Sequence, residues 1–242
     1  MKRLKILIMF FFLVLIIQSE LTNVSAMETG FLTLELSEEE KTRFLSNVNI
    51  TLLSLEPQKR GIDCFDVNEY GMIAIGTSES EKKYISIYDS EGIFQYGYTF
   101  HSSGSFGLEW SGKNIIIYWV RSDVAACVDS EGELIDISKI LNSTENNSYW
   151  RNFVFSRERK IGNDRYIMKN GDGVLGFFNP SYSQIIHTNE NEDIRIIYEI
   201  DESYSVEVLT ILIGVILFVG FVIYKMVLEF RKLKSNNISR AS

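Results

Sequence analysis

The residue types that most often carry chemistry in proteins are sparse and far apart in this sequence. His101 and His187 are the only histidines, and Cys64 and Cys127 are the only cysteines. Zinc sites need histidine and cysteine ligands at short spacings, and these four residues form no such group. Ser102 follows His101 directly, but the loop around it lacks the pattern of a nucleophile elbow. The sequence therefore predicts no catalytic residue, no metal site and no cofactor.

The two cysteines are candidates for a disulfide. Cys64 and Cys127 both lie in the segment that we expect outside the membrane, where disulfides persist. A link across that length of chain stabilises by about 4 kcal/mol in the chain-entropy model. Each cysteine also lies within a run that we expect to be a strand, where a buried thiol serves as a small apolar filler. We favour two free thiols, and alkylation of the denatured, non-reduced protein tests this.

Aromatic residues give the one indication of a binding surface. They are concentrated between residues 94 and 119, and Arg121 follows them. Core packing accounts for most aromatic side chains in a sheet. An arginine beside an exposed aromatic ring also suits contact with a carbohydrate or a peptide. We therefore name Trp119 and Arg121 as candidate ligand contacts.

A membrane-spanning helix is the clearest element that must position these residues. Residues 208–224 are seventeen consecutive positions without a charge, and Lys225 follows at once. A run of about 17 to 20 apolar residues matches the hydrocarbon core of a bilayer. The stretch after the span is rich in lysine and arginine, so we expect it to be cytoplasmic. The prediction is a single-pass protein of the cell membrane, with a span at 206–224, a basic cytoplasmic tail at 225–242 and the N-terminal domain outside.

The N-terminus agrees with this topology. Lys2, Arg3 and Lys5 precede an apolar run of twelve residues, and small residues at Val24, Ser25 and Ala26 follow it. This pattern predicts a signal peptide at 1–26, cleaved after Ala26. The alternative is an uncleaved signal anchor that uses residues 4–17 as a short span. Both interpretations place residues 27–205 outside the cell.

The expected outer segment is strongly acidic. Residues 27–205 hold 16 lysines and arginines against 29 aspartates and glutamates, so most of the negative charge of the chain lies there. Nucleic acids and anionic lipid surfaces attract basic proteins, so this balance argues against nucleic acid as a partner. A segment of this length supports one domain with a substantial core.

Short apolar runs separated by turn residues predict an all-β domain between residues 27 and 205. Ser37 and Glu40 form a capping box that predicts a helix over 38–45, and 136–141 is expected to form one helical turn. The segment 142–148 is expected to be an exposed linker. The expected strands are 62–67, 72–75, 85–88, 94–100, 106–110, 115–120, 124–128, 134–137, 165–169, 174–178, 184–187 and 194–200.

The turns between these strands repeat. The sequence Asp-Ser-Glu-Gly begins at Asp89 and again at Asp129, forty residues later. A period of about 40 residues with four strands is typical of propeller blades. We expect blades at 62–100, 105–140 and 152–188. Gly173 continues the period, and residues 179–182 are an equally good match for the turn between the last two strands of the third blade. Strands at 31–36, 48–55 and 194–200 would supply a fourth blade; the alternative is an open stack of β-meanders.

The strand, Asp-x-x-Gly, strand pattern over residues 62–140 resembles the extracytoplasmic repeats of NHL-type propellers. The chain also resembles uncharacterised single-span membrane proteins of Gram-positive bacteria, a resemblance that implies no activity. We expect a membrane-tethered recognition module that binds an envelope protein, a peptide or a glycan. The alternative is an extracytoplasmic hydrolase acting on cell-wall or envelope polymers. The lack of a recognisable nucleophile or metal motif favours recognition over catalysis.

Overall fold

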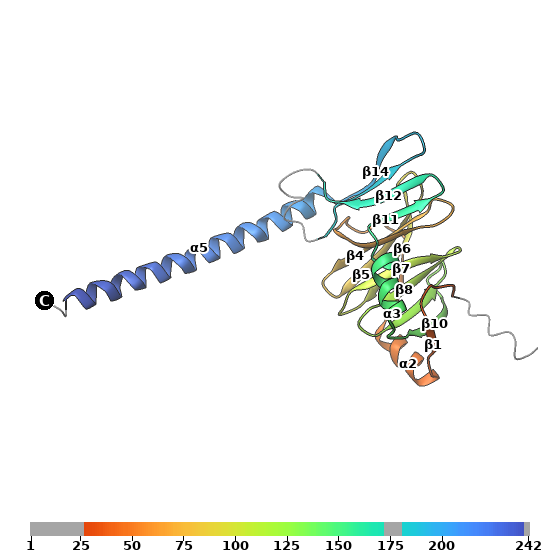
Figure 1. Ribbon diagram of the computed structural model, residues 1–242, viewed down its shortest axis with the longest axis horizontal. Helices are drawn as coiled ribbons and strands as arrows, with labels where there is room; N and C mark the ends of the chain where they lie inside the picture. Colours follow the sequence, from red (N-terminus) through yellow and green to blue (C-terminus); the bar gives the residue numbers. More distant parts are fainter. Residues whose placement is uncertain (1–26, 172–180, 240–242) are drawn as a thin grey trace, which may run out of the picture.

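The computed structural model describes residues 27–171 and 181–239. It contains three antiparallel β-sheets and one long C-terminal helix that leaves the sheets at one end (Figure 1). The expectation of a β-rich chain with one apolar C-terminal helix is therefore confirmed. The predicted signal segment at 1–26 and the predicted strand at 174–178 lie outside the described residues.

The first sheet matches the first predicted repeat, because its strands β3 to β6 follow one another as a meander. Its bounds are β3 Ile62–Val67, β4 Ile73–Glu79, β5 Lys82–Tyr88 and β6 Phe94–His101. A short strand, β2 Thr51–Leu53, is added to the outer edge, where it pairs with β6. This sheet is buried on both faces, which explains the continuous apolar run in β4 and β5.

The second sheet matches the second predicted repeat. Its bounds are β7 Phe106–Ser111, β8 Asn114–Trp119, β9 Val124–Val128 and β10 Leu134–Ile140, with β1 Thr33–Glu35 at the edge beside β10. The helical turn expected at 136–141 is wrong, because this stretch pairs along β9 as part of β10. Pairing along a whole strand outweighs the weak helical preference of a few residues.

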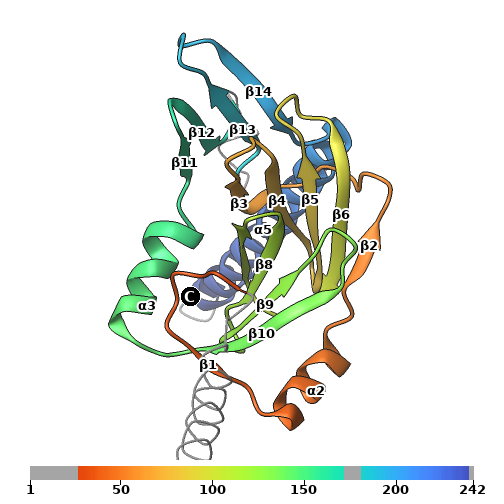
Figure 2. The same cartoon turned by 90° about the vertical axis from the view of Figure 1, so that its right-hand side faces the viewer.

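The third sheet consists of β11 Glu158–Ile161, β12 Asp164–Lys169, β13 Gln184–Thr188 and β14 Ile194–Glu199. The expected fourth blade is wrong. Its three strands go to three different sheets, since β1 joins the second sheet, β2 the first and β14 the third. The three sheets do not close into a ring. Figure 2, which views the domain from the end opposite α5, shows the first sheet between the other two.

Three turns between the third and fourth strands of a sheet share one geometry and begin at Asp89, Asp129 and Asn189. In each turn, Oδ1 of this first residue accepts hydrogen bonds from the backbone N–H groups two and four positions later. The fourth residue has a positive φ, and it is glycine in the first two turns but Glu192 in the third. The geometry predicted from Asp-x-x-Gly therefore recurs at Asn189, and Gly173, where the period was expected to continue, lies outside the described residues.

Helices occupy the segments between the sheets. The helix predicted over 38–45 is confirmed as α2 Glu38–Asn47, with the capping box between Ser37 and Glu40. The exposed linker expected at 142–148 is wrong, because α3 Thr144–Tyr149 lies there with Asn146 buried and bonded to the backbone of Leu32 and Leu141. The segment expected to open the third blade is instead a π-helix, η1 Trp150–Val154.

The core is divided into layers by the first sheet. One cluster of buried residues fills the space between the first and second sheets, and another lies between the first and third. A third cluster covers the outer face of the second sheet, where Met27, Phe31 and Val154 pack from the N-terminal segment and η1. The first sheet thus buries its two faces against the other two sheets, whereas the second sheet buries its outer face under the N-terminal segment and η1.

A glycine couples the first sheet to the third, and its replacement should destabilise the domain. Gly92 has a φ of +83°, and a Cβ there would lie 2.7 Å from the carbonyl oxygen of Ile197 in β14. Gly112 has a φ of +61° with open space around it. We expect Gly112→Ala to lower the free energy of unfolding by about 1 to 2 kcal/mol through backbone strain alone, and Gly92→Ala to lower it further. Urea unfolding measures both; equal losses would show that the contact with β14 contributes nothing.

The helix α5 Glu202–Ser239 contains one stretch, Leu209–Leu228, that is long and apolar enough to cross a membrane, with a mean hydropathy of 2.7. None of this stretch is buried against the sheets. Its 20 residues extend over about 30 Å, the thickness of the hydrocarbon core of a bilayer. A single-pass membrane protein is consistent with this helix.

Candidate functional site

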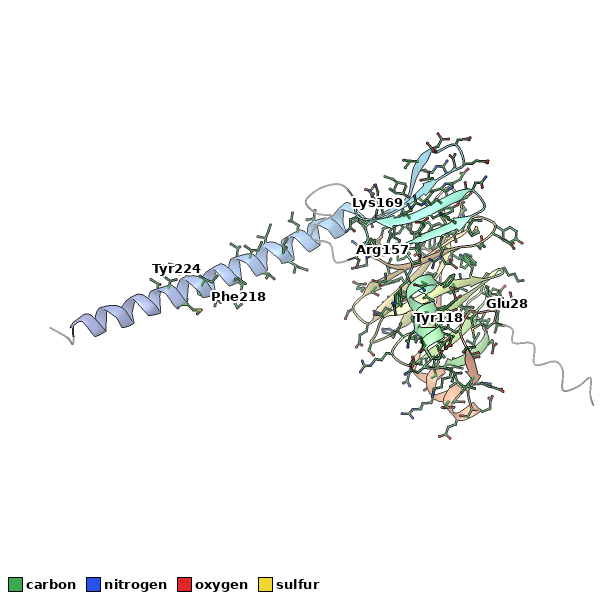
Figure 3. All side chains as sticks on the ribbon, in the orientation of Figure 1. Glu28, Tyr118, Arg157, Lys169, Phe218 and Tyr224 are labelled. Atoms are coloured by element: carbon green, nitrogen blue, oxygen red, sulfur yellow. The ribbon has the colours of Figure 1, made fainter. Side chains whose placement is uncertain are left out.

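The β domain has two distinct ends, defined by where α5 joins it. At the basal end, the backbone N–H of Asp201 bonds to the carbonyl of Lys59, and that of Ser183 bonds to the carbonyl of Lys169. Figure 3 shows Lys169 beside the start of α5. The turns at Asp89, Asp129 and Asn189 lie at the opposite ends of their strands, which we call the distal end.

The distal end carries much of the negative charge of the domain. In its turns at 68–72, 89–93, 112–113, 129–133, 162–163 and 189–193, nine residues are acidic and one, Lys113, is basic. Carboxylates at the tips of neighbouring turns create a negative potential over this surface. The negative charge of residues 27–205 is therefore unevenly distributed, and acidic residues greatly outnumber basic ones in the turns far from α5.

A groove of about 690 Å³ opens at the distal end, between the first and third sheets. One wall is formed by the turn that contains Glu69 and Tyr70 and by Glu91 of the next turn. The other wall comes from the third sheet, which contributes Asp164 and Arg195. The groove thus combines several carboxylates with one guanidinium group and an exposed aromatic ring, a composition suited to a polar ligand with cationic groups.

A histidine and a tyrosine are stacked on the wall of this groove. Tyr166 and His187 are opposite each other in the β12–β13 ladder, and their rings stack at 4.5 Å with 11° between their planes. Nε2 of His187 lies 3.4 Å from Oδ2 of Asp164, but the geometry makes no hydrogen bond, and Nε2 has no hydrogen-bond partner among the described residues. His187 therefore places an unsatisfied polar atom behind the wall of this groove, where it is buried.

The first strands of the three sheets meet in a polar network below the groove. Nε of Arg159 in β11 lies 2.6 Å from Oδ1 of Asp66 in β3, and both side chains are 13% exposed. Oδ2 of Asp66 accepts a hydrogen bond from the backbone N–H of Trp110 in β7. The ion pair and this hydrogen bond, both made by Asp66, therefore join all three sheets.

Glu109 of β7 extends this network toward the N-terminal segment. Its carboxylate accepts hydrogen bonds from the hydroxyls of Tyr118 and Tyr149, and the Tyr118 hydroxyl also bonds to Thr29. Burial raises the pKa of Glu109, partly offset by the two tyrosine hydrogen bonds. Burial likewise raises the pKa of Tyr118. These contacts fix α3 and the N-terminal segment against the second sheet.

Because the pKa of Glu109 is raised, its contribution to stability depends on pH. The folded domain binds this proton more tightly than the unfolded chain, so the contribution is complete below the unfolded pKa and is lost as pH rises through the folded pKa. We expect the unfolding free energy of the native protein, relative to Glu109→Gln, to fall as pH rises from about 4 to 8. Urea unfolding of both proteins across this range measures it; a difference that rises with pH would contradict the prediction.

The residues predicted as ligand contacts lie at the basal end, not in the distal groove. Trp119 is 3% exposed and packs edge-on against Phe44 and Phe100, so it belongs to the core. Arg121 is exposed in the next turn, and its Nη1 donates a hydrogen bond to Oγ of Ser103. Trp119 and Arg121 are close in the sequence, but Trp119 is the last residue of β8 and is buried, whereas Arg121 lies in the exposed turn that follows.

The two cysteines lie on different faces of the core. Cys64 is in the cluster between the first and second sheets, whereas Cys127 is in the cluster on the outer face of the second sheet. Both are buried as free thiols in this structure, and burial raises the pKa of each, that of Cys127 to about 11. The thiolate forms are therefore disfavoured, and the redox state stays a prediction for alkylation to test.

Sequence reasoning missed the groove and the polar network because their members are distant in the chain. Asp66 and Arg159 are 93 residues apart, and both stand among many other charged residues. Within the described residues, no group of three histidine, cysteine or acidic side chains is arranged to hold a metal ion. One signal was available: a charged residue near the middle of an otherwise apolar strand, as at Asp66 and Glu109, indicates a buried polar contact.

No family model and no curated protein matches this chain. Two solved structures show a distant likeness to it. A streptogramin B lyase has a TM-score of 0.26 and 13% identity, over 62% of this chain and 45% of that one. A catalytically inactive virginiamycin B lyase from Staphylococcus aureus with quinupristin has a TM-score of 0.25 and 12% identity, over 65% and 61%. The chain spans less than two thirds of either structure, and at these TM-scores the likeness assigns neither fold nor function.

Proposed function

We propose that this protein is a membrane-tethered recognition module, with residues 27–205 outside the cell and 225–242 in the cytoplasm. The observation that carries the proposal is the position of the groove, which opens at the end of the domain opposite the start of α5. A partner that approaches the membrane from outside meets this end first. The orientation is supported by the lysines and arginines that follow the span.

We further propose that the three sheets are blades of an open, propeller-like arrangement. The turns at Asp89, Asp129 and Asn189 stand at the same position in each sheet. The first strands β3, β7 and β11 lie together through the network of Asp66 and Arg159. In such an arrangement the turns at one end form a continuous surface, and ligands bind across neighbouring blades.

The composition of the groove favours a partner that presents cationic groups, such as a peptide or protein segment with lysine or arginine. Glu69, Glu91 and Asp164 line the groove, and carboxylates form charge-assisted hydrogen bonds with ammonium and guanidinium groups. The ring of Tyr70 is 74% exposed beside them and can stack on the same cations. Recognition then requires no reacting group, only complementary charge and shape.

Site-specific crosslinking in intact cells tests the binding surface. A photoreactive amino acid at Tyr70 should capture a defined partner, whereas the same group at Ser122, an exposed residue of a basal turn, should not. The combined variant Glu69→Lys and Glu91→Lys should abolish the capture at Tyr70. Equal capture at both positions, or turnover of an envelope polymer by the purified protein, would overturn the proposal.

Thiol labelling tests the orientation independently. Cys64 and Cys127 are buried, so a cysteine introduced at the exposed Ser130 gives a distinct signal. We expect a membrane-impermeant maleimide to label Ser130→Cys in intact cells and to label Ser235→Cys only after the cells are opened. The reverse pattern would place the domain on the other side of the membrane.

A further inference from the structure

A second opening lies at the basal end, between the first and second sheets, and neither the groove nor the polar network uses it. This basal pocket has a volume of about 490 Å³. It is lined by the start of β3 at Asp63, the end of β4 at Ser78, the start of β5 at Lys83 and the turn before β7. These strand ends lie on the same side of the domain as the start of α5.

The basal pocket contains a buried lysine that forms no ion pair, although the carboxylate of Asp63 lies near enough to interact with it electrostatically. Lys83 is 7% exposed, and its Nζ donates one hydrogen bond, to the carbonyl oxygen of Ser80 at 2.8 Å. Among the described residues no carboxylate lies within ion-pair distance of it. Lysine is almost never buried unless it is paired, because removing its charge from water is costly. An anion in the pocket would supply the missing partner.

The turn before β7 lines the pocket with hydroxyls, and Arg121, from the turn after β8, lies beside it. Ser103 and Ser105 line it together with Gly104, and Nη1 of Arg121 lies 3.3 Å from Oγ of Ser103. A Cβ at Gly104 would come within 3.1 Å of Cβ of Arg121, so glycine allows Arg121 to pack over this turn. Lysine, arginine and serine hydroxyls together are the groups that bind phosphate oxygens.

The charges indicate which anion fits. Lys83 and Arg121 are positive, and Asp63 is negative, with its carboxylate hydrogen-bonded by the hydroxyl of Ser78. The local balance is therefore one positive charge, which a monoanionic phosphate diester neutralises. An anion with two charges would leave an excess of negative charge beside Asp63.

The bilayer brings such a group close to the pocket. Residues 202–208 separate the β domain from the span, and as a helix they extend over about 10 Å. The head-group layer on each side of the hydrocarbon core is about 5 to 7 Å thick. The basal end of the domain therefore lies near the lipid phosphates.

We propose that the basal pocket binds a phosphate ester, with Lys83 and Arg121 as its cations. The source is either a phospholipid head group, which would fix the domain on the membrane surface, or a soluble phosphate diester. The proposal rests on the basal pocket alone and is independent of what the distal groove binds.

Calorimetric titration of the full-length protein in detergent micelles tests the proposal with three monoanionic phosphate diesters as separate probes: dioctanoyl phosphatidylglycerol, glycerophosphoglycerol and dimethyl phosphate. We expect Lys83→Met and Arg121→Gln each to weaken binding at least tenfold. Lys82→Met is the matched control, because it removes the same charge from the adjacent residue, whose ammonium lies over the ring of Tyr84; it should leave binding unchanged.

The three probes distinguish the two sources. Binding of the lipid at concentrations where both soluble diesters fail supports a head-group site, and comparable binding of the soluble diesters supports a soluble ligand. The exposed position of Arg121 keeps the test valid if Lys83→Met fails to fold. Absence of binding by all three probes, or an equal loss in Lys82→Met, would overturn the proposal.

Discussion

Replacement of Arg159 by methionine is expected to lower the free energy of unfolding of the β domain by about 3 to 5 kcal/mol. Methionine keeps the apolar stem of arginine, so the change removes the guanidinium group alone. Asp66 would then retain a buried carboxylate whose described partner is the backbone N–H of Trp110. The contact of the guanidinium with the ring of Phe65 would also be lost. Urea unfolding followed by near-ultraviolet circular dichroism measures the effect.

The sheet that contains Arg159 offers a matched control. Arg165 donates two hydrogen bonds of 2.8 Å to Glu158, a geometry at least as good as that of Arg159, but its side chain is 50% exposed. Exposed ion pairs contribute little, because water solvates both charges once the pair is broken. Arg165→Met should therefore change stability only slightly. Similar losses in the two variants would show that burial of the Asp66–Arg159 pair does not decide its contribution.

The repeat could be predicted from the sequence where a turn demands particular residues. Asp89 and Asp129 each accept two backbone hydrogen bonds, and glycine provides the positive φ three positions later, so both turns were recognisable. The third turn could not be recognised in the sequence because Glu192, and not a glycine, has the positive φ, at 63°. The local sequence thus predicts this turn only where the fourth position is glycine, the residue least strained at a positive φ.

The destinations of the edge strands could not be predicted in the same way. The apolar patterns at β1 and β2 showed that these segments pair with something, but pairing partners are chosen by packing across long stretches of chain. Thr33 pairs with Ile140 and Thr51 with Thr99, in different sheets. The apolar pattern of a strand indicates which of its faces is buried, but it does not indicate which sheet edge the strand pairs with. The sequence therefore predicted a fourth blade, whereas in the structure β1 and β2 each add a fifth strand to an existing sheet.

The candidate sites were largely hidden from the sequence for a related reason. Lys83 stands beside Lys82 at the start of β5, and nothing in the local pattern shows that one is buried and the other is not. Alternation along β5 places the two side chains on opposite faces of the strand. The second sheet packs on the face that carries Lys83, and this packing cannot be read from the local sequence. Trp119 shows the converse, since a ring next to a charged turn suggested exposure but is covered by Phe44 and Phe100.

Arginines at the centre of the predicted span should remove this protein from the membrane. Phe218 and Val219 lie in the middle of Leu209–Leu228, and both are exposed along α5. An arginine at the centre of a spanning helix costs about 2.5 to 3.5 kcal/mol on the insertion scale, so two cost about 5 to 7 kcal/mol. This insertion cost is large relative to the favourable insertion free energy that each leucine or isoleucine of the span contributes. Phe218→Arg with Val219→Arg should therefore transfer most of the protein from the carbonate-resistant membrane fraction to the soluble fraction.

The matched control places the same two charges near the end of the span. Met226 and Val227 follow Lys225, and long basic side chains near a helix end extend into the head-group layer. Met226→Arg with Val227→Arg should leave the protein in the membrane fraction. Because the two pairs add identical charge to the same helix, only their depth differs. If both variants leave the membrane, or if both remain although N-terminal sequencing shows that the mature chain begins at Met27, α5 does not span the bilayer with its centre near Phe218. The separation of a distal groove from a membrane-facing basal pocket then loses its basis.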